Sequence, residues 1–171
     1  LGCPFRCSYC AAWRLQPEFK VNDPKKLIEY IGKLSLRGIK DIVFFDDAIL
    51  VAKSNFKRLL ELIISSGLNT LRYHLPNGLH VSLIDREIAK LLKDANFKTV
   101  ILAVETLDSI LQKKTSNKLI SEDFYRAVSI LKDEGFSNEL KVYLLMNMPG
   151  QTEESVLTSM LACHELGLRI Y

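Results

Sequence analysis

The chain has 171 residues and a net charge of +3, with 48% apolar and 25% charged residues. This is the composition of one globular domain, and so small a charge gives no reason to expect a nucleic-acid partner. Four cysteines are too few for a disulfide scaffold, no apolar run reaches the roughly 18 residues of a membrane span, and no signal peptide is recognisable. We therefore expect a cytoplasmic protein that is not attached to a membrane.

Three cysteines open the chain with the spacing C-x3-C-x2-C, at Cys3, Cys7 and Cys10. A structural zinc site closes with four ligands, and a ferredoxin-type cluster also takes four cysteines. Three thiolates on a 4Fe–4S cluster would leave one iron open to bind and reduce a small molecule. The alternative to such a cluster is a zinc knuckle or three functionally unrelated thiols. The remaining cysteine, Cys163, lies in a helical pattern and is typical of a buried apolar residue.

The first half of the chain alternates helical and strand patterns. A helix is predicted from the cap at Asn22-Asp23-Pro24 to Gly38, and a strand buried on both faces over residues 39–45. A second helix, with Phe56, Leu59, Leu60 and Ile63 facing inward, ends near Gly67, and a strand follows over residues 68–75.

The second half continues the alternation. Ser82 and Asp85 resemble a capping box, before a helix whose inner face is Ile88, Leu91 and Leu92. Strands are predicted over residues 99–104, 140–146 and 168–171. Between them we expect a short helix over 107–113 and a helix from Ser121 to Gly135 with Phe124, Ala127, Val128 and Leu131 facing inward. The last helix is capped by Thr152, and its predicted inner face is Val156, Leu157, Met160 and Leu161.

This order predicts an α/β fold, in which a parallel sheet carries its helices outside and places its chemistry at the carboxyl ends of the strands. Polar residues stand at these predicted ends. They are Asp46 and Asp47 after the first strand, Asn77 after the second, Glu105 after the third and Asn147 after the fourth. Acidic and amide groups gathered there suit a ligand that carries an ammonium group and hydroxyls.

With these segments in order, the chain resembles the radical S-adenosylmethionine superfamily, most closely the branch that often carries a cobalamin-binding domain. The cysteine run, with Tyr9 before its last cysteine, is the specific part of the likeness. The segments Phe44-Phe45-Asp46-Asp47, Ala103-Val104-Glu105-Thr106 and 147–152 resemble further family segments. The resemblance implies a partial (β/α)6 barrel similar to a TIM barrel, with its first strand before the cysteines and its last strand only begun at Tyr171. We therefore expect residues 1–171 to be the core domain of a longer protein.

The resemblance also implies the cofactors and partners. Cys3, Cys7 and Cys10 would hold a 4Fe–4S cluster whose open iron binds S-adenosylmethionine, and cleavage of that molecule would yield a 5′-deoxyadenosyl radical. Tyr9 would contact the adenine through its backbone, Asp46 and Asp47 the methionine ammonium, Asn77 and Glu105 the carboxylate or the ribose, and Asn147 the adenine. A flavodoxin or ferredoxin would supply electrons, and cobalamin would come from a domain outside the chain.

Within the family, the first hypothesis is a cobalamin-dependent methyl transfer to an unidentified substrate, and the second is a methylthiotransferase. A non-catalytic metal-binding module is the alternative from another class. Two positions depart from the family pattern: Asp46-Asp47 reaches less far than the usual glutamate, and Asn147 replaces a glycine. Simpler interpretations stay open for several of these residues. Asp46 and Asp47 could form a solvated turn, Glu105 could pair with a cation, and His74 and His80 could be structural residues.

Overall fold

The computed structural model describes residues 1–115, 121–137 and 140–171. Within these residues, five parallel strands form one sheet in the order β1-β2-β3-β4-β5. Their bounds are β1 Asp41–Val43, β2 Arg72–His80, β3 Phe97–Glu105, β4 Leu140–Leu144 and β5 Arg169–Ile170. The order along the sheet follows the order along the chain, as expected for successive β-α-β units.

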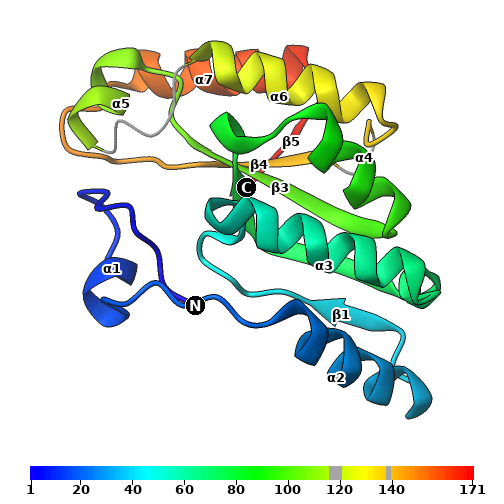
Figure 1. Cartoon of the computed structure of the whole chain (residues 1–171). Helices are drawn as coiled ribbons and strands as arrows, with labels where there is room; N and C mark the ends of the chain where they lie inside the picture. Colours follow the sequence, from blue (N-terminus) through cyan, green and yellow to red (C-terminus); the bar gives the residue numbers. More distant parts are fainter. Residues whose placement is uncertain (116–120, 138–139) are drawn as a thin grey trace.

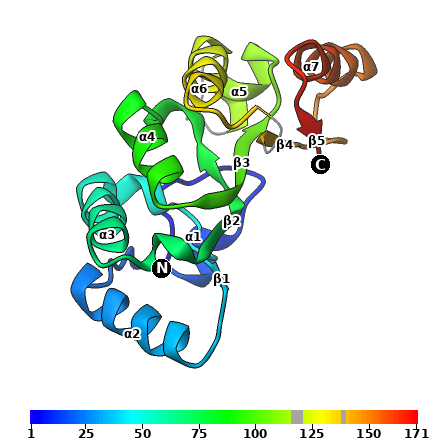
Figure 2. The ribbon, with the colours of Figure 1, turned by 90° about the vertical axis from the view of Figure 1, so that its right-hand side faces the viewer.

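The helices that connect the strands lie outside the curved sheet (Figures 1 and 2). The helix bounds are α1 Ala12–Leu15, which lies apart from the sheet in the N-terminal segment, α2 Pro24–Leu36, α3 Lys53–Ser65, α4 Arg86–Asp94, α5 Ser109–Thr115, α6 Ser121–Asp133 and α7 Glu153–Glu165. Short 3-10 turns lie at Ile49–Ala52, Leu68–Thr70 and Val81–Leu83. The α/β class and the partial barrel with outer helices are confirmed.

Local sequence signals account for most of the helix starts. The side chain of Asp23 accepts a hydrogen bond from the Lys25 amide, with Pro24 in the first turn, and Thr152 caps α7 by accepting from the Ser155 amide. The predicted cap at Ser82 is wrong. Asp85 caps α4 instead, by accepting from the amide of Ile88, because the chain turns through a 3-10 segment before the helix begins.

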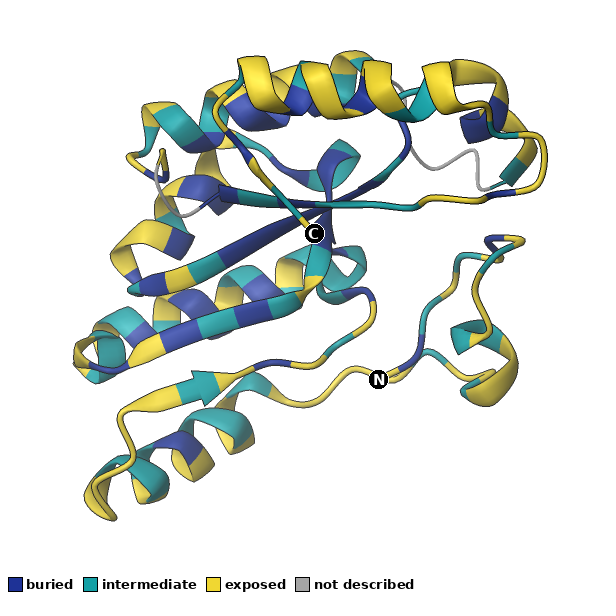
Figure 3. Cartoon of the chain, turned by 180° about the vertical axis from the view of Figure 1, so that it is seen from behind, coloured by how far each residue is buried: buried dark blue, intermediate teal, exposed yellow. Residues whose placement is uncertain are grey.

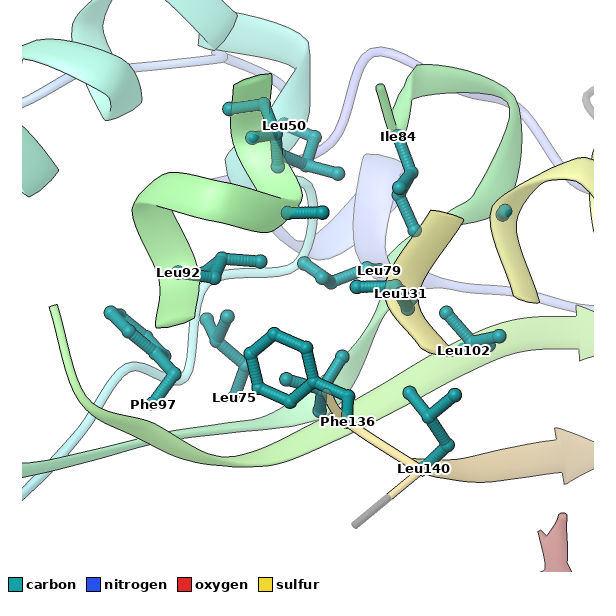
Figure 4. Packing of buried hydrophobic residues seen from close by; sticks show 14 of the residues in the cluster. Leu50, Leu75, Leu79, Ile84, Leu92, Phe97, Leu102, Leu131, Phe136 and Leu140 are labelled. Carbon is teal, nitrogen blue, oxygen red and sulfur yellow. The ribbon is translucent and has the colours of Figure 1, made fainter. Parts of the chain in front are cut away.

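The core lies between the sheet and its helices (Figure 4). The predicted inward faces of α3 and α6 are buried in it, and Tyr73 and Phe97 stack there at 5.3 Å between ring centroids. Burial raises the pKa of Tyr73 to about 12, while its hydroxyl donates to the Leu68 carbonyl. Cys163 is fully buried, as expected.

At β1 the other face of the sheet is uncovered, so the predicted burial of the first strand on both faces is wrong. Val43 and Phe45 are 45% and 69% exposed, whereas their neighbour Phe44 is 7% exposed and packs in the core. Successive side chains point to opposite sides of a strand, and the helices cover only the convex side (Figure 2). The strand is also shorter than predicted, ending at Val43.

The predicted inner face of α7 is wrong as well. Leu157 and Leu161 are 58% and 60% exposed, and the buried residues of this helix are Ser159 and Cys163 (Figure 3 shows burial along the helices). Ser159 faces inward because its hydroxyl donates to the Ser155 carbonyl and accepts from the Leu107 amide. Counting apolar residues alone therefore selected the other side of the helix.

Candidate functional site

The cysteines lie in a loop, residues 1–20, whose two ends are joined. The Lys20 amide donates to the Leu1 carbonyl at 2.9 Å. Gly2 has a φ of +80°, and a Cβ there would lie 2.6 Å from the Glu18 carbonyl oxygen. Only glycine permits both this backbone conformation and this close approach, so Gly2 allows the loop to close.

Backbone hydrogen bonds shape the cysteine run and attach it to the body of the protein. The Cys10 amide donates to the Cys7 carbonyl at 3.1 Å, and the Ala12 amide donates to Cys10 Sγ at 3.5 Å. The Ser8 amide donates to the carbonyl of Thr115, at the end of α5, at 2.8 Å. All the cysteines of the chain are free thiols.

The loop and the strand ends enclose a cavity of about 270 Å³. This volume is near the lower end of the range for small-molecule sites, roughly 300–1,000 Å³. Most of the predicted site residues line it, namely Cys3, Cys7, Tyr9, Cys10, Asp47, Asn77 and Glu105. Three short segments far apart in sequence therefore meet the cysteine loop at one place.

The three cysteines fit a three-thiolate cluster. Their side chains line one cavity, and Cys10 Sγ already accepts an amide hydrogen bond of the kind that stabilises thiolate ligands. In the described part of the chain, no three His, Cys, Asp or Glu side chains converge on a point that could hold a single metal ion. A 4Fe–4S cluster does not need such convergence, since each thiolate binds a separate iron.

Asn77 and Gly78 reach the cavity from an irregular part of β2. The prediction placed them after the strand, but the strand runs on to His80 and its pairing with β3 shifts between Leu75 and Leu79. Gly78 has a φ of +83°, and a Cβ there would lie 3.1 Å from Ala103 Cβ and 3.3 Å from the Tyr143 ring. A bulge at this point turns the two residues toward the ligand side.

Hydrogen bonds connect this bulge to the segment after β1 on one side and to β4 on the other. Asn77 Nδ2 donates to the Phe45 carbonyl at 2.8 Å, which joins β2 to the segment after β1. The Tyr143 hydroxyl on β4 donates to the Pro76 carbonyl at 2.7 Å, across the small side chain of Ala103 on β3. The bulge thus connects the Asp47 side of the cavity to the Glu105 side.

Glu105 ends β3 with a φ of +66°, in the left-handed region that is unfavourable for a residue with a side chain. The pairing of β3 with β4 shifts between Ala103 and Glu105, and the Leu145 amide donates to the Glu105 carbonyl at 2.7 Å. Strained backbone of this kind costs of order 1–3 kcal/mol and concentrates at functional sites. The strain turns a half-buried carboxylate into the cavity.

The side chains of Asp46 and Asp47 line two different pockets. Asp47 lines the cavity, whereas Asp46 lines a second pocket of about 120 Å³ between the loop, α2 and α3. The Asp46 carboxylate lies 3.6 Å from the nitrogen of Leu1. The expected pair of adjacent acids on one ligand is therefore not formed, because consecutive side chains of an extended segment diverge.

Asn147 is exposed and is not among the residues that line the cavity. It has a φ of +62°, and the turn around it is held by Gln151, which accepts from the Met148 amide and donates to the Leu145 carbonyl. Its predicted contact with adenine stays a prediction.

His80 is a cavity residue that the sequence analysis did not select. It is 6% exposed, and its ring lies 4.5 Å from the Phe5 ring of the cysteine loop. The only available sequence signal was its position shortly after Pro76-Asn77-Gly78. His74 lies elsewhere, between Thr99 and Asp41, to which its ring nitrogens hydrogen-bond at 2.9 and 3.1 Å, so its structural interpretation is favoured.

Comparison with known proteins agrees with this geometry. Residues 1–163 match the Radical SAM superfamily, and the chain belongs to that superfamily of enzymes, which use a 4Fe–4S cluster and S-adenosylmethionine. The structure of the radical S-adenosylmethionine methyltransferase TsrM from Kitasatospora setae, with cobalamin and a 4Fe–4S cluster bound, is similar with a TM-score of 0.84. It is 25% identical and covers 98% of this chain and 33% of its own.

Two curated relatives are about equally similar in sequence. The anaerobic magnesium-protoporphyrin IX monomethyl ester cyclase of Rubrivivax gelatinosus is 25% identical over 91% of this chain and 28% of its own length. The tRNA-2-methylthio-N(6)-dimethylallyladenosine synthase of Anaplasma phagocytophilum is 25% identical over 99% of this chain and 40% of its own. The chain thus spans less than half the length of the relatives it matches. Among the described residues, no helix has the length and apolar character needed to cross a bilayer.

Proposed function

We propose that residues 1–171 form the core domain of a radical S-adenosylmethionine enzyme and that Cys3, Cys7 and Cys10 are its cluster ligands. The observation that carries this proposal is that all three cysteines line one cavity together with the polar residues of three strand ends. When bound, the cluster supplies an electron that cleaves S-adenosylmethionine and so provides the 5′-deoxyadenosyl radical chemistry of the superfamily.

The residues of the chain bind and orient the cofactor in this proposal. The Asp47 carboxylate accepts hydrogen bonds from the methionine ammonium, and Asp46, which faces the other pocket, takes no part. Glu105 and Asn77 meet the ribose or the methionine carboxylate, with Asn77 held in place by its bond to the Phe45 carbonyl. The Tyr9 backbone contacts the adenine. Gly78 and Ala103 leave the cavity floor open because they carry little or no side chain.

The acceptor reaction that we favour is a cobalamin-dependent methyl transfer, with cobalamin held outside residues 1–171. The similarity to TsrM supports it. A methylthiotransferase is the second candidate, supported by the 25% identity to the tRNA-modifying relative. The free thiols are consistent with a reducing compartment such as the cytoplasm. A small electron-carrying protein would reduce the cluster there.

Anaerobic reconstitution tests the cluster assignment. We expect about four irons and four sulfides per chain, and a change in the EPR spectrum of the reduced cluster when S-adenosylmethionine is added. Cys7→Ala should lose the cluster and the formation of 5′-deoxyadenosine, whereas Cys163→Ala, a change in the buried core cysteine, should keep both. One tightly bound zinc and no iron–sulfur absorbance would contradict the proposal.

The two acceptor reactions are separated by supplying cobalamin to the full-length protein. Methyl transfer that depends on added cobalamin supports the first candidate. Transfer of a methylthio group to tRNA without cobalamin supports the second and rejects the first.

A further inference from the structure

The cysteine loop has two chemically different sides. Its inner side lines the cavity with Cys3, Cys7, Cys10 and their neighbours Phe5 and Tyr9. Residues between these are exposed, and the large apolar side chain of Leu15, at the end of α1, is 81% exposed. Figure 1 shows the loop and α1 set apart from the helices that cover the sheet. The exposed residues of the loop therefore form a surface distinct from the cavity lining, which we call its outer side.

This outer side is basic. Residues 1–17 contain two arginines, Arg6 and Arg14, and no carboxylate. Both guanidinium groups lie over the ring of Trp13, with Cζ at 5.6 and 4.8 Å from its centroid. The nearby Lys20 is paired with Glu18 at 2.7 Å, but neither arginine forms an ion pair with a carboxylate among residues 1–115, 121–137 and 140–171. Two cations are thus held in place without being neutralised.

We propose that Arg6, Trp13, Arg14 and Leu15, together the outer loop face, are the docking surface for an acidic protein that delivers one electron to the cluster. This inference rests on the proposed function, in which S-adenosylmethionine fills the inner side of the loop. A donor must then approach the thiolates from outside, where Arg6 adjoins Cys7 in the chain. The step itself oxidises the reduced flavin or iron–sulfur centre of the carrier by one electron and reduces the cluster by one electron, with no bond made or broken.

The composition of the outer loop face matches that of small protein interfaces. Tryptophan and arginine are among the residues that most often dominate binding energy, and an exposed leucine adds to the apolar area of an interface. Unpaired cations attract an acidic partner over distance and accelerate encounter. A nucleic acid is the other anionic partner to consider. Nucleic-acid affinity depends largely on the number of phosphate contacts, and two arginines supply few compared with a protein that makes about 6–10 of them.

Charge reversal on the holoenzyme tests the docking surface, with an acidic flavodoxin as the probe. In Arg6→Glu/Arg14→Glu we expect the Kd of the oxidised flavodoxin, measured by calorimetry, to rise about tenfold or more, and the rate of cluster reduction by reduced flavodoxin to fall similarly. The matched control is Lys33→Glu/Arg37→Glu, the same charge change on two exposed residues of α2 and just beyond its end. It should leave both quantities within about twofold of the parent protein.

Reduction by dithionite separates this proposal from the proposed function. Dithionite is small and needs no docking surface, so dithionite-driven cleavage of S-adenosylmethionine should be equal in parent and variant. If the parent protein shows no such cleavage, the proposed function fails. If cleavage is normal but flavodoxin binding is unchanged in the double variant, only the docking surface is wrong.

Two further measurements complete the test. If the double variant does not retain its cluster, Arg14→Glu alone is measured, since this residue lies outside the cysteine run, and unchanged flavodoxin binding there would reject the proposal. Binding of a structured RNA is measured in parallel. If charge reversal weakens RNA binding but leaves flavodoxin binding intact, the outer loop face is a nucleic-acid surface and the electron-carrier proposal is overturned.

Discussion

Three residues outside the glycines have positive φ angles in the described structure, and they differ in what their conformation achieves. Asn96 uses its side chain to donate to the Leu71 carbonyl, so it has a structural role. Asn147 lies in an exposed turn. Glu105 is the one among them that lines the cysteine cavity, and it has the side chain least suited to the left-handed region. Backbone strain at a residue whose side chain lines a cavity is the expected mark of a functional residue.

Glu105→Gln preserves the size of this side chain and removes its charge. We expect the Kd for S-adenosylmethionine, measured by calorimetry on the reconstituted protein, to rise roughly 10–100-fold, because a hydrogen bond to a charged group contributes about 1.5–3 kcal/mol. Iron content should not change. Glu165→Gln, on the exposed end of α7, serves as control. Equal affinities in the two variants would remove Glu105 from the proposed site.

At the scale of elements, β1 and β2 are joined at their first residues by a charged network. Arg72 donates twice to the Asp41 carboxylate, at 2.6 and 2.5 Å, and His74 hydrogen-bonds to the same carboxylate. The hydrogen bonds from Arg72, and then that from His74, lower the pKa of Asp41 from 3.8 to about 2. Asp41 and Arg72 are also partners in the strand register, so the network helps to align the edge strand.

This shift predicts a pH dependence of stability. Because the folded-state pKa lies below the unfolded value, ionised Asp41 stabilises the fold fully above pH 3.8, and the contribution is lost as the pH falls toward about 2. Urea unfolding of Asp41→Asn should therefore show a weaker loss of stability over this interval than the parent protein. Glu29→Gln, an exposed residue of α2, should keep the parent slope. A parent-like slope in Asp41→Asn would show that the network does not contribute.

Tyr143 on β4 is a positioning residue for the cavity, which it does not itself line. Its hydroxyl holds the Pro76 carbonyl and its ring packs at Gly78, so it fixes the bulge from which Asn77 reaches the cavity. Tyr143→Phe should reduce the free energy of unfolding by about 1 kcal/mol. It should also increase amide hydrogen exchange in residues 77–79 and weaken S-adenosylmethionine binding several-fold.

Tyr171→Phe is the matched control for this prediction. Its ring lies 6.4 Å from that of Tyr143, on the neighbouring end of the sheet, and its hydroxyl is not tied to the bulge. Exchange in residues 77–79 should stay at the parent level in this variant. If both variants behave alike, the effect does not come from the bond between the Tyr143 hydroxyl and the Pro76 carbonyl.

At the scale of the whole molecule, the cysteine loop lies outside the main hydrophobic core. The buried core begins at Ile31 and includes none of residues 1–20. The loop is closed by the bond between Leu1 and Lys20, and the bond from Ser8 to Thr115 and the ring contact of Phe5 with His80 attach it to the rest of the chain. Segments with few buried apolar contacts open at lower free energy than the core.

Removal of the cluster with an iron chelator under anaerobic conditions should therefore leave the core folded. We expect the far-UV circular dichroism to be retained and the Tm to change by only a few degrees, while amide exchange in residues 3–15 rises sharply. Cooperative unfolding of the whole chain on iron removal would show instead that the cluster is part of the core's stability.

The cysteine run, the alternation of helices and strands, and the inward faces of α3 and α6 were predictable because each depends on residues close together in the chain. Spacing of thiolates within eight residues and a helical period of 3.6 are local properties. The same local signals failed at α7, where two serine hydrogen bonds outweighed the apolar pattern, and at β1, whose second face the helices leave uncovered.

Which residues line the cavity could not be predicted from the sequence, because it depends on three-dimensional contacts. Asp46 and Asp47 are adjacent in sequence and equivalent in chemistry, yet only Asp47 faces the cysteines. Bulges in β2 and β3 place Asn77 and Glu105 there, and the same curvature brings in His80. A shift of one residue along a strand reverses the direction of a side chain, and such shifts are set by packing between strands that are distant in the chain.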